Sequence, residues 1–445
     1  MLKNWKTILL LAIPSIASFA SMTVTGTINL IMVGNLGALA IAIVGVSNIV
    51  MYNVWALCSG IGHTVNYLVA QSYGSGEMEK GVERTFIALL LGGAAGVLII
   101  LAGFFATEAI FKVLGSSSEM IAEGNGYLQI RFFAIVFSIF SFTIHGFFRG
   151  IGNTRTPMFA SLLANAAMIF FTYSLTYGKL GFPELGLTGA AWALFIGEVI
   201  GLLFTAYAFI KTVKPSLKPV LRFIEAKFIS IESFKLGMQE FSKSMAMFVF
   251  TAFVTRLGTH ALAANEIALS IMSFGFMPAA AFGSTATILV GQEIGRRYPS
   301  TAKSMGTQTA IMGSLFILLL GTTEFIFAEP LARIYTNDPL VYQLTAKLIM
   351  ISAFLQLFDG FFSFYSGGLR GIGDTTFLMR ASLALAWGFF IPLTYLLVFV
   401  FNLSSYGAWI ALYTYLSVFG LILMARYYRT NWNNITMTKA GSQVA

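Results

Sequence analysis

Long apolar segments separated by short polar ones dominate the chain. Each holds roughly 20 to 25 predominantly apolar residues, the length that an α-helix needs to cross the hydrocarbon core of a bilayer. The segments are continuously apolar rather than alternating, so the pattern excludes the strands of a membrane β-barrel. The pattern predicts twelve helices, over residues 7–33, 40–71, 85–111, 125–148, 157–177, 188–210, 234–255, 261–291, 305–328, 343–369, 380–402 and 405–428.

The composition also indicates a membrane protein. Of the 445 residues, 57% are hydrophobic and 10% are charged, and the mean hydropathy is +0.80. Soluble domains carry about 25% charged residues, so too few remain here to solvate a water-exposed surface. The first apolar segment is long enough to span a bilayer and is followed by further spans, which excludes a secretory signal. We therefore expect an all-α polytopic membrane protein with twelve transmembrane helices.

Cysteine and histidine are too sparse for a metal or disulfide framework. The chain has one cysteine, Cys58, and three scattered histidines, His63, His145 and His260. These exclude an internal disulfide and match no zinc, haem or iron–sulfur spacing, so we expect no metal, no cofactor and no enzyme active site. The net charge of +9 indicates contact with membrane lipid rather than nucleic acid, because basic residues collect in cytoplasmic loops.

The distribution of basic residues predicts the orientation. Of the 27 lysines and arginines, 20 fall on one side of the predicted spans and 6 on the other, with Lys243 inside a span. Because cytoplasmic loops carry the excess of positive charge, both termini are expected in the cytoplasm, in a multi-pass protein of the cell membrane. Arg131 and Arg256 lie near predicted helix ends and are expected to reach the membrane interface.

The two halves of the chain repeat each other at an offset of 221 residues. Pairs that align without a gap are Leu36–Gly37 with Leu257–Gly258, Gln71 with Gln292, Gly74 with Gly295, and Arg149–Gly152 with Arg370–Gly373. Six spans per half is an even number, so the repeats are parallel and related by an axis along the membrane normal. Two such lobes can form a cleft that opens to either side when one rocks against the other.

This duplication predicts the domain organisation. The N-terminal six-helix lobe covers residues 1–210, and a basic cytoplasmic linker covers 211–233. The C-terminal six-helix lobe covers 234–428, and a cytoplasmic tail covers 429–445. Because a pseudo-dimer is already built into one chain, we expect a monomer.

Short motifs recur in the same order in both halves. The first half contains VGNLG at 33–37, VAQ at 69–71, RGIGNT at 149–154 and FPELG at 182–186. The second contains AANEIA at 263–268, VGQ at 290–292, LRGIGDT at 369–375 and IPL at 391–393. Together they resemble the multidrug and toxic compound extrusion (MATE) family over essentially the whole chain, with a leaning toward its DinF-like branch.

The resemblance implies a secondary active exporter that moves small lipophilic or cationic compounds out of the cell in exchange for protons. Sodium coupling on the same scaffold is one alternative. A lipid-linked precursor flippase of related fold is another, although that activity predicts extra helices and a basic central cavity. The Arg-Gly-Ile-Gly loops are interpreted as helix ends anchored by arginine, not as phosphate-binding loops, because no strand precedes them.

Ionisable residues inside spans are candidates for the coupling ion, because burying charge in a membrane is unfavourable. Asp359 lies eleven residues before Arg370, about 16 Å along the helix, near mid-membrane. The family carries a functional aspartate at this position of the tenth span. Glu266 and Glu198 also lie within spans, where each could carry protons or only join helices.

Lys243 departs from the sodium-coupled branch of the family. There a glutamate that helps to coordinate the cation occupies about this position, and a lysine would repel sodium. Lys243 could instead pair with Asp359 or Glu266. Alternatively, it could extend to the inner membrane interface beside Glu240. Both alternatives remain open at this point.

The first lobe departs further from the family. Proton-coupled members carry an aspartate five residues before the Val-Gly-x-Leu-Gly turn, where this chain has Asn29. A second aspartate of the fifth helix corresponds to Thr172, near Asn165. Because neither asparagine nor threonine titrates, these two positions of the first lobe cannot carry a coupling proton. Asn29 is explained either by natural divergence or by an engineered replacement of aspartate.

The abundance of soft apolar side chains fits an adaptable binding site. The chain has 19 methionines and 43 phenylalanines, of which most face lipid and the rest can repack around different ligands. Expected substrate contacts are Asn29, Met32, Met22 and Asn165.

Overall fold

The computed structural model describes residues 2–113, 117–213, 222–336 and 338–438, and all regular elements within these ranges are helical. The first lobe contains α1 (Leu2–Gly34), α2 (Ala38–Gly74), α3 (Met78–Val113), α4 (Ser118–Gly150), α5 (Arg155–Tyr177) and α6 (Gly186–Thr212). The second contains α7 (Phe223–Thr255), α8 (Thr259–Gly295), α9 (Pro299–Ile326), α10 (Ala328–Tyr335), α11 (Pro339–Ile372), α12 (Thr375–Leu385), α13 (Ile391–Tyr395) and α14 (Ser404–Arg429).

The twelve predicted spans are confirmed. Eleven helical segments are long and apolar enough to cross a membrane, among them one that joins α12 and α13 over residues 375–400. The twelfth is α7, which carries six charged residues in 33. The helix α7 is less apolar than the other spans. It packs against α2 and α12, so its polar side chains need not face lipid.

The eleventh predicted span is less regular than expected. Two π-helical segments, Ala386–Phe390 and Leu396–Val400, flank α13. Pro392 lies between them and lacks the N–H that an α-helix needs, which accounts for a local change in the hydrogen-bond pattern. The short α10 is an additional helix that the hydropathy pattern did not predict.

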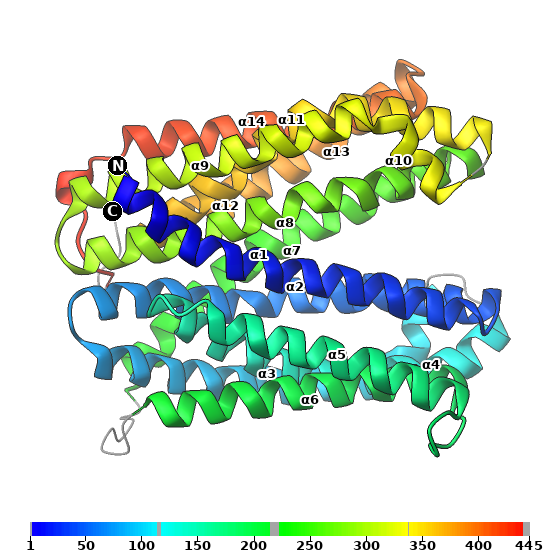
Figure 1. The fold of residues 1–445 in the computed structure, drawn as a ribbon, viewed down its shortest axis with the longest axis horizontal. Coiled ribbons are helices and arrows are strands. Elements are labelled where there is room, and N and C mark those ends of the chain that lie inside the picture. The colour runs from blue at the N-terminus through cyan, green and yellow to red at the C-terminus, as the bar shows by residue number, and fades with distance from the viewer. Residues whose placement is uncertain (1, 114–116, 214–221, 337, 439–445) are drawn as a thin grey trace.

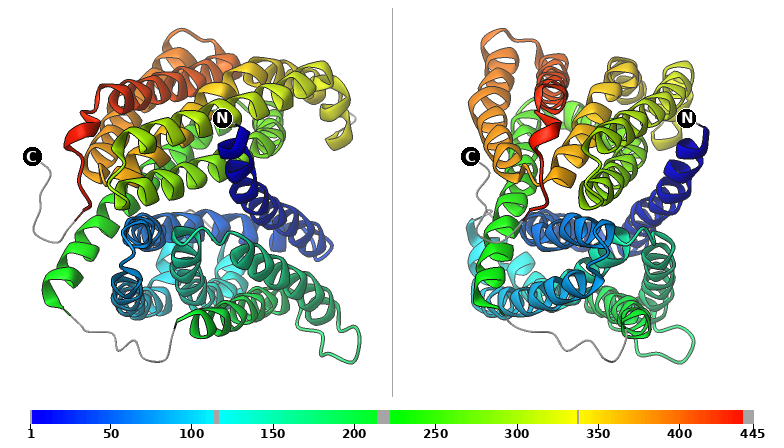
Figure 2. Two further views of the ribbon diagram at one scale, coloured as in Figure 1. Left: turned by 60° about the vertical axis from the view of Figure 1, so that its left-hand side comes forward. Right: turned by 90° about the vertical axis from the view of Figure 1, so that its left-hand side faces the viewer.

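The duplication is visible in the helix boundaries. The offset of 221 residues places Leu2–Gly34 on Phe223–Thr255 and Ala38–Gly74 on Thr259–Gly295, so α1 maps onto α7 and α2 onto α8 without a shift. In Figure 1, α2–α6 form the lower lobe and α8–α14 the upper one. The helix α1 runs obliquely between them and contacts α8 as well as α5, as both views of Figure 2 show.

The Arg-Gly-Ile-Gly motifs end α4 and α11, as the sequence predicts. Gly152 has φ +82° and Gly373 has φ +84°, a left-handed conformation that glycine adopts without steric strain. The turn therefore requires glycine at this position in both halves.

The expected linker and tail differ in detail from the structure. Part of the 211–233 linker, residues 214–221, lies outside the described residues, and 223–233 form the first turns of α7. In the 429–445 tail, residues 439–445 also lie outside them. The described part of the tail reaches Thr438, whose backbone N–H donates to Gln71 Oε1 at 2.8 Å.

Two equivalent hydrogen bonds join the lobes at the end of the molecule where α1 begins and α14 ends, here called the terminal end. Gln71 Nε2 of the first lobe donates to the Gly371 carbonyl of the second at 2.9 Å. Gln292 Nε2 of the second lobe donates to the Gly150 carbonyl of the first, also at 2.9 Å. We call this pair the glutamine lock.

Replacing both lock glutamines should loosen the terminal end. Each bond contributes roughly 1 kcal/mol. Each single Gln→Ala change should therefore raise the labelling rate of a cysteine at the half-buried Ser284, whose hydroxyl is inaccessible, about fivefold, and the double change more. Ser284 lies eight residues before Gln292 on α8. The measurement is maleimide labelling of the Ser284→Cys variant with Cys58 replaced by serine.

A matched control is available in α9. Gln308 is buried, and its Nε2 donates to Ser304 Oγ within the same helix at 3.0 Å. Gln308→Ala should therefore leave the labelling rate unchanged. Equal rates in the lock variants and this control would show that the glutamines do not hold the lobes together.

Candidate functional site

A cavity of about 1390 Å³ lies between the lobes and is lined by α1, α2, α4, α5, α6, α7 and α8. Its lining extends from Arg149, near the end of α4, to Thr255 and Leu262, where α7 ends and α8 begins. The lining therefore runs from close to the glutamine lock toward the opposite end of the molecule.

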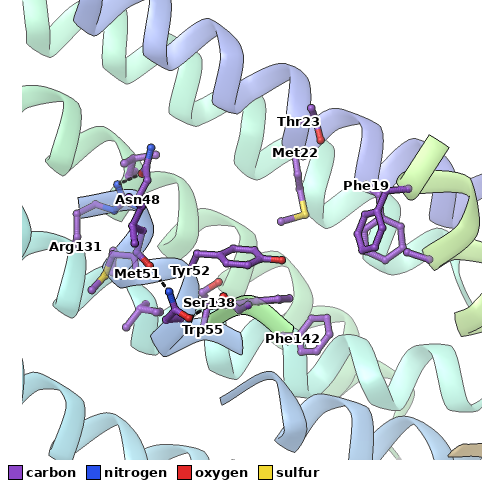
Figure 3. A pocket seen from close by; sticks show the side chains of 18 of the residues that line it. Phe19, Met22, Thr23, Asn48, Met51, Tyr52, Trp55, Arg131, Ser138 and Phe142 are labelled. Carbon is purple, nitrogen blue, oxygen red and sulfur yellow. Dashed lines mark hydrogen bonds between the residues drawn. The ribbon is translucent and has the colours of Figure 1, made fainter. Parts of the chain in front are cut away.

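Aromatic and methionine side chains form much of the wall. Tyr52 and Trp55 of α2 stack with ring centroids 6.3 Å apart, and Trp55 meets Phe142 of α4 edge-on at 5.4 Å. Figure 3 shows Phe19 and Met22 of α1 opposite this group. Such a wall offers flat apolar contacts and soft side chains that can repack around a drug-sized molecule.

Four of the predicted site residues line this cavity: Met22, Asn165, Glu198 and Glu266. Asn165 Nδ2 donates to Ser21 Oγ at 2.8 Å, which ties α5 to α1. Glu198 lies beside Ser138, while Glu266 is exposed. The sequence thus identified residues from four of the seven helices around the cavity.

The other predicted residues of the first lobe lie away from the cavity lining. Thr172 is fully buried, and neither its hydroxyl nor the Asn29 side-chain oxygen has a hydrogen-bond partner among the described residues. The carbonyl of Met32 accepts a hydrogen bond from Tyr177 at 2.5 Å. Asn29 and Thr172 therefore belong to the packing of α1 and α5 inside the first lobe.

Arg131 lies in the cavity wall instead of at the membrane interface. Its Nη1 donates to Asn48 Oδ1 at 2.9 Å (Figure 3). It also donates to the Tyr127 hydroxyl at 3.2 Å. The expectation failed because α4 begins at Ser118, seven residues before the predicted span, so Arg131 is well inside the helix. Arg256 also lines the cavity, at the opposite end from the lock.

Asp359 and Lys243 lie together inside the second lobe. Asp359 is 7% exposed, and the positive charge of Lys243 attracts its carboxylate. The Lys243 ammonium lies between two aromatic rings, 4.3 Å from the centroid of Phe362 and 4.8 Å from that of Phe276. Glu240 lies 3.4 Å from Arg370 instead of beside Lys243. The attraction to Asp359 agrees with the alternative in which Lys243 pairs with that residue, and the two aromatic contacts are an addition that the sequence did not predict.

Glu324 is a buried acid that the sequence analysis missed. It lies near the end of α9, is 5% exposed, and accepts a hydrogen bond from Gln356 of α11. Gln356 is one turn before Asp359, so two carboxyl groups approach the same face of α11. Its position as an acidic residue inside the apolar segment 305–328 could have identified it from the sequence.

The positive charge of Lys243 should stabilise the folded protein, because it attracts the buried carboxylate of Asp359. Lys243→Met should destabilise the protein by about 2 kcal/mol, since it leaves a buried carboxylate without a cation. Asp359→Asn in the same background should recover much of this loss, because the uncompensated charge disappears. Thermal unfolding of the purified variants measures both effects.

Lys303→Met provides the control for loss of an aromatic contact. The Lys303 ammonium lies 5.7 Å from the centroid of Tyr428, and a much smaller effect is expected. If Lys243→Met and Lys303→Met were equally destabilising, or if Asp359→Asn added to the loss, electrostatic coupling of Lys243 with Asp359 would be ruled out.

Comparison with known proteins supports the same architecture. The MatE family model matches the chain twice, over residues 14–174 and 236–396. The "probable multidrug resistance protein NorM" of Thermotoga maritima is 27% identical over 416 residues, covering 92% of this chain and 88% of the relative. Its namesake from Halalkalibacterium halodurans is 29% identical over 405 residues, covering 89% and 88%.

Solved structures show the same fold at lower identity. A MATE protein crystallised in the straight conformation superposes with a TM-score of 0.88 at 21% identity, covering 96% of this chain and 95% of that one. An outward-facing multidrug resistance MATE transporter gives 0.87 with the same identity and coverage. The expected fold, with two six-helix lobes, is confirmed.

Proposed function

Because the chain belongs to the MATE family of transporters and is not an enzyme, we propose that it exports lipophilic organic cations from the cell in exchange for protons. The cavity between the lobes carries this proposal. Aromatic and methionine side chains supply apolar contacts, and Glu198 and Glu266 supply negative charge for a cation. The relatives named as multidrug resistance proteins support the same class of substrate.

Transport proceeds by alternating access of the cavity. The glutamine lock closes the terminal end, while Tyr52 and Met22 retain 57% and 52% exposure in the cavity. In the opposite state the lock opens and the cavity faces the terminal end. Between the two states, the two lobes rock as rigid bodies about their interface, as expected for parallel repeats.

The coupling proton binds at Asp359 in the second lobe. Asp359 is an ionisable group held inside the helix bundle, 7% exposed and near the positive charge of Lys243. A proton drives the switch only if it binds the two lobe arrangements with different affinity. The attraction between Lys243 and Asp359 supports such a difference, because it depends on the relative positions of α7 and α11.

Sodium coupling is the weaker alternative. Sodium is a hard cation that needs several oxygen ligands, and Asp359, Glu324 and Gln356 offer some. However, the Lys243 ammonium already places a positive charge at Asp359 and would repel a metal cation.

We also propose that the chain is a monomer in the cell membrane with both termini in the cytoplasm. The excess of basic residues at the terminal end supports this orientation. A fluorescent protein fused after Ala445 should be shielded from external protease in intact cells. Cleavage of that reporter in unbroken cells would reverse the proposed orientation.

Transport assays in proteoliposomes test the coupling. A proton gradient should drive uptake of a fluorescent organic cation with Asn29 unchanged, and a sodium gradient should not. Asp359→Asn should reduce proton-driven uptake to the level of empty liposomes, because the amide cannot carry a proton. Asn29→Asp should leave the identity of the coupling ion unchanged.

Asp374→Asn is the matched control. Asp374 follows α11 and lies 2.9 Å from Arg426, away from the cavity lining, so uptake should be maintained. Uptake driven by sodium would overturn proton coupling. Proton-driven uptake that appears only in the Asn29→Asp variant would move the coupling site to the first lobe.

A further inference from the structure

Arg149 is a buried arginine at the end of the cavity closest to the glutamine lock. It is 5% exposed, yet it lines the cavity. Its guanidinium lies between two rings, 5.5 Å from the centroid of Phe19 and 5.3 Å from that of Phe142. No carboxylate of the described residues lies within ion-pair distance of it. A guanidinium in such surroundings is unfavourable unless an anion accompanies it.

The second repeat contains the same arginine with its charge balanced. Arg370 lies at the equivalent position, 3.4 Å from Glu240 and 2.9 Å from His63 Nδ1. The residue equivalent to Glu240 in the first repeat is Phe19. The chain therefore has an aromatic ring beside Arg149 in place of the acid that balances Arg370.

Neighbouring donors on α4 face the same space. Ser138, Ser141, His145 and Arg149 recur at helical spacing and all line the cavity. Ser141 is 7% exposed, and its hydroxyl has no hydrogen-bond partner among the described residues. Together with the guanidinium, this hydroxyl gives the site unused hydrogen-bond donors for an anion.

The other charges of the cavity do not compensate Arg149. Among its described lining residues, the acids are Glu198 and Glu266. Glu198 lies within the influence of Arg131. Glu266 is exposed near the start of α8, toward the end of the cavity that holds Arg256. A positive charge therefore remains at the closed end of the cavity.

We infer that Arg149 and Ser141 form a subsite for an anionic group, such as a carboxylate or sulfonate, of the transported compound. This inference rests on the proposed function and assigns the residues that recognise the anionic group when the transported compound carries one. The anionic group forms charge-assisted hydrogen bonds with Arg149, the aromatic part packs against Phe142 and Trp55, and the cationic part faces Glu198.

A pair of dyes isolates the anionic group in the unaltered protein. One is a xanthylium dye with a free benzoate, and the other is its methyl ester, which keeps the cation but lacks the anion. Fluorescence anisotropy measures binding to the full chain in phosphatidylcholine nanodiscs, which hold no anionic lipid. The benzoate dye should bind about tenfold more tightly than the ester.

Two variants assign the preference to Arg149. Arg149→Gln should abolish the preference for the benzoate, whereas Arg149→Lys should retain part of it because the charge remains. Binding of the ester should persist in both variants and tighten in Arg149→Gln, because a positive charge that repels the cation is removed. Ester binding that persists also shows that the variants fold. Equal binding of both dyes to the unaltered protein, or equal loss of both in Arg149→Gln, would overturn the subsite.

The same dyes separate this inference from the proposed function. Uptake of the ester into proteoliposomes with no preference for the benzoate would overturn only the anionic subsite. Failure of the unaltered protein to bind or transport either dye would overturn the proposed export of organic cations and the subsite with it.

Discussion

The close crossing of α2 and α8 holds the two lobes in their present arrangement. A Cβ atom added at Gly74 would lie 2.0 Å from the Gln292 carbonyl oxygen, and one added at Gly295 would lie 2.1 Å from that of Gln71. Only glycine permits this approach, because any side chain would clash with the facing backbone. The approach brings the two glutamine amides within reach of the opposite lobe.

The membrane makes each polar group inside the helix bundle depend on a partner within the protein. Lipid cannot hydrogen-bond to a buried side chain, so polar groups inside the bundle must find partners in the protein. Many do: Tyr67 and Thr375 both donate to Glu232, which joins α2, α7 and the start of α12. Others have no hydrogen-bond partner among the described residues, and of these the hydroxyl of Ser141 belongs to a residue that lines the cavity.

Hydropathy and the internal repeat predicted the fold because both follow from local sequence. Span length depends on apolar content, and the boundaries of α1, α2, α7 and α8 agree with the offset found by self-comparison. The site was harder to predict. Whether a charged residue lies at the membrane interface or inside the bundle depends on its distance from the helix end, and that distance is known only once the first residue of the helix is known. Arg131 was therefore misplaced, and Glu324 was overlooked because its partner Gln356 is 32 residues away.

Fusion of the two repeats into one chain has freed the lobes from identical chemistry. A dimer of identical six-helix subunits would have to place the same side chain at both copies of every position. Here the boundaries of α1 and α2 recur in α7 and α8 at a shift of 221 residues, yet Phe19 stands where the other lobe has Glu240, and Phe142 where it has Ser363. The two halves can thus evolve different side chains at equivalent positions while the helices that carry them stay the same.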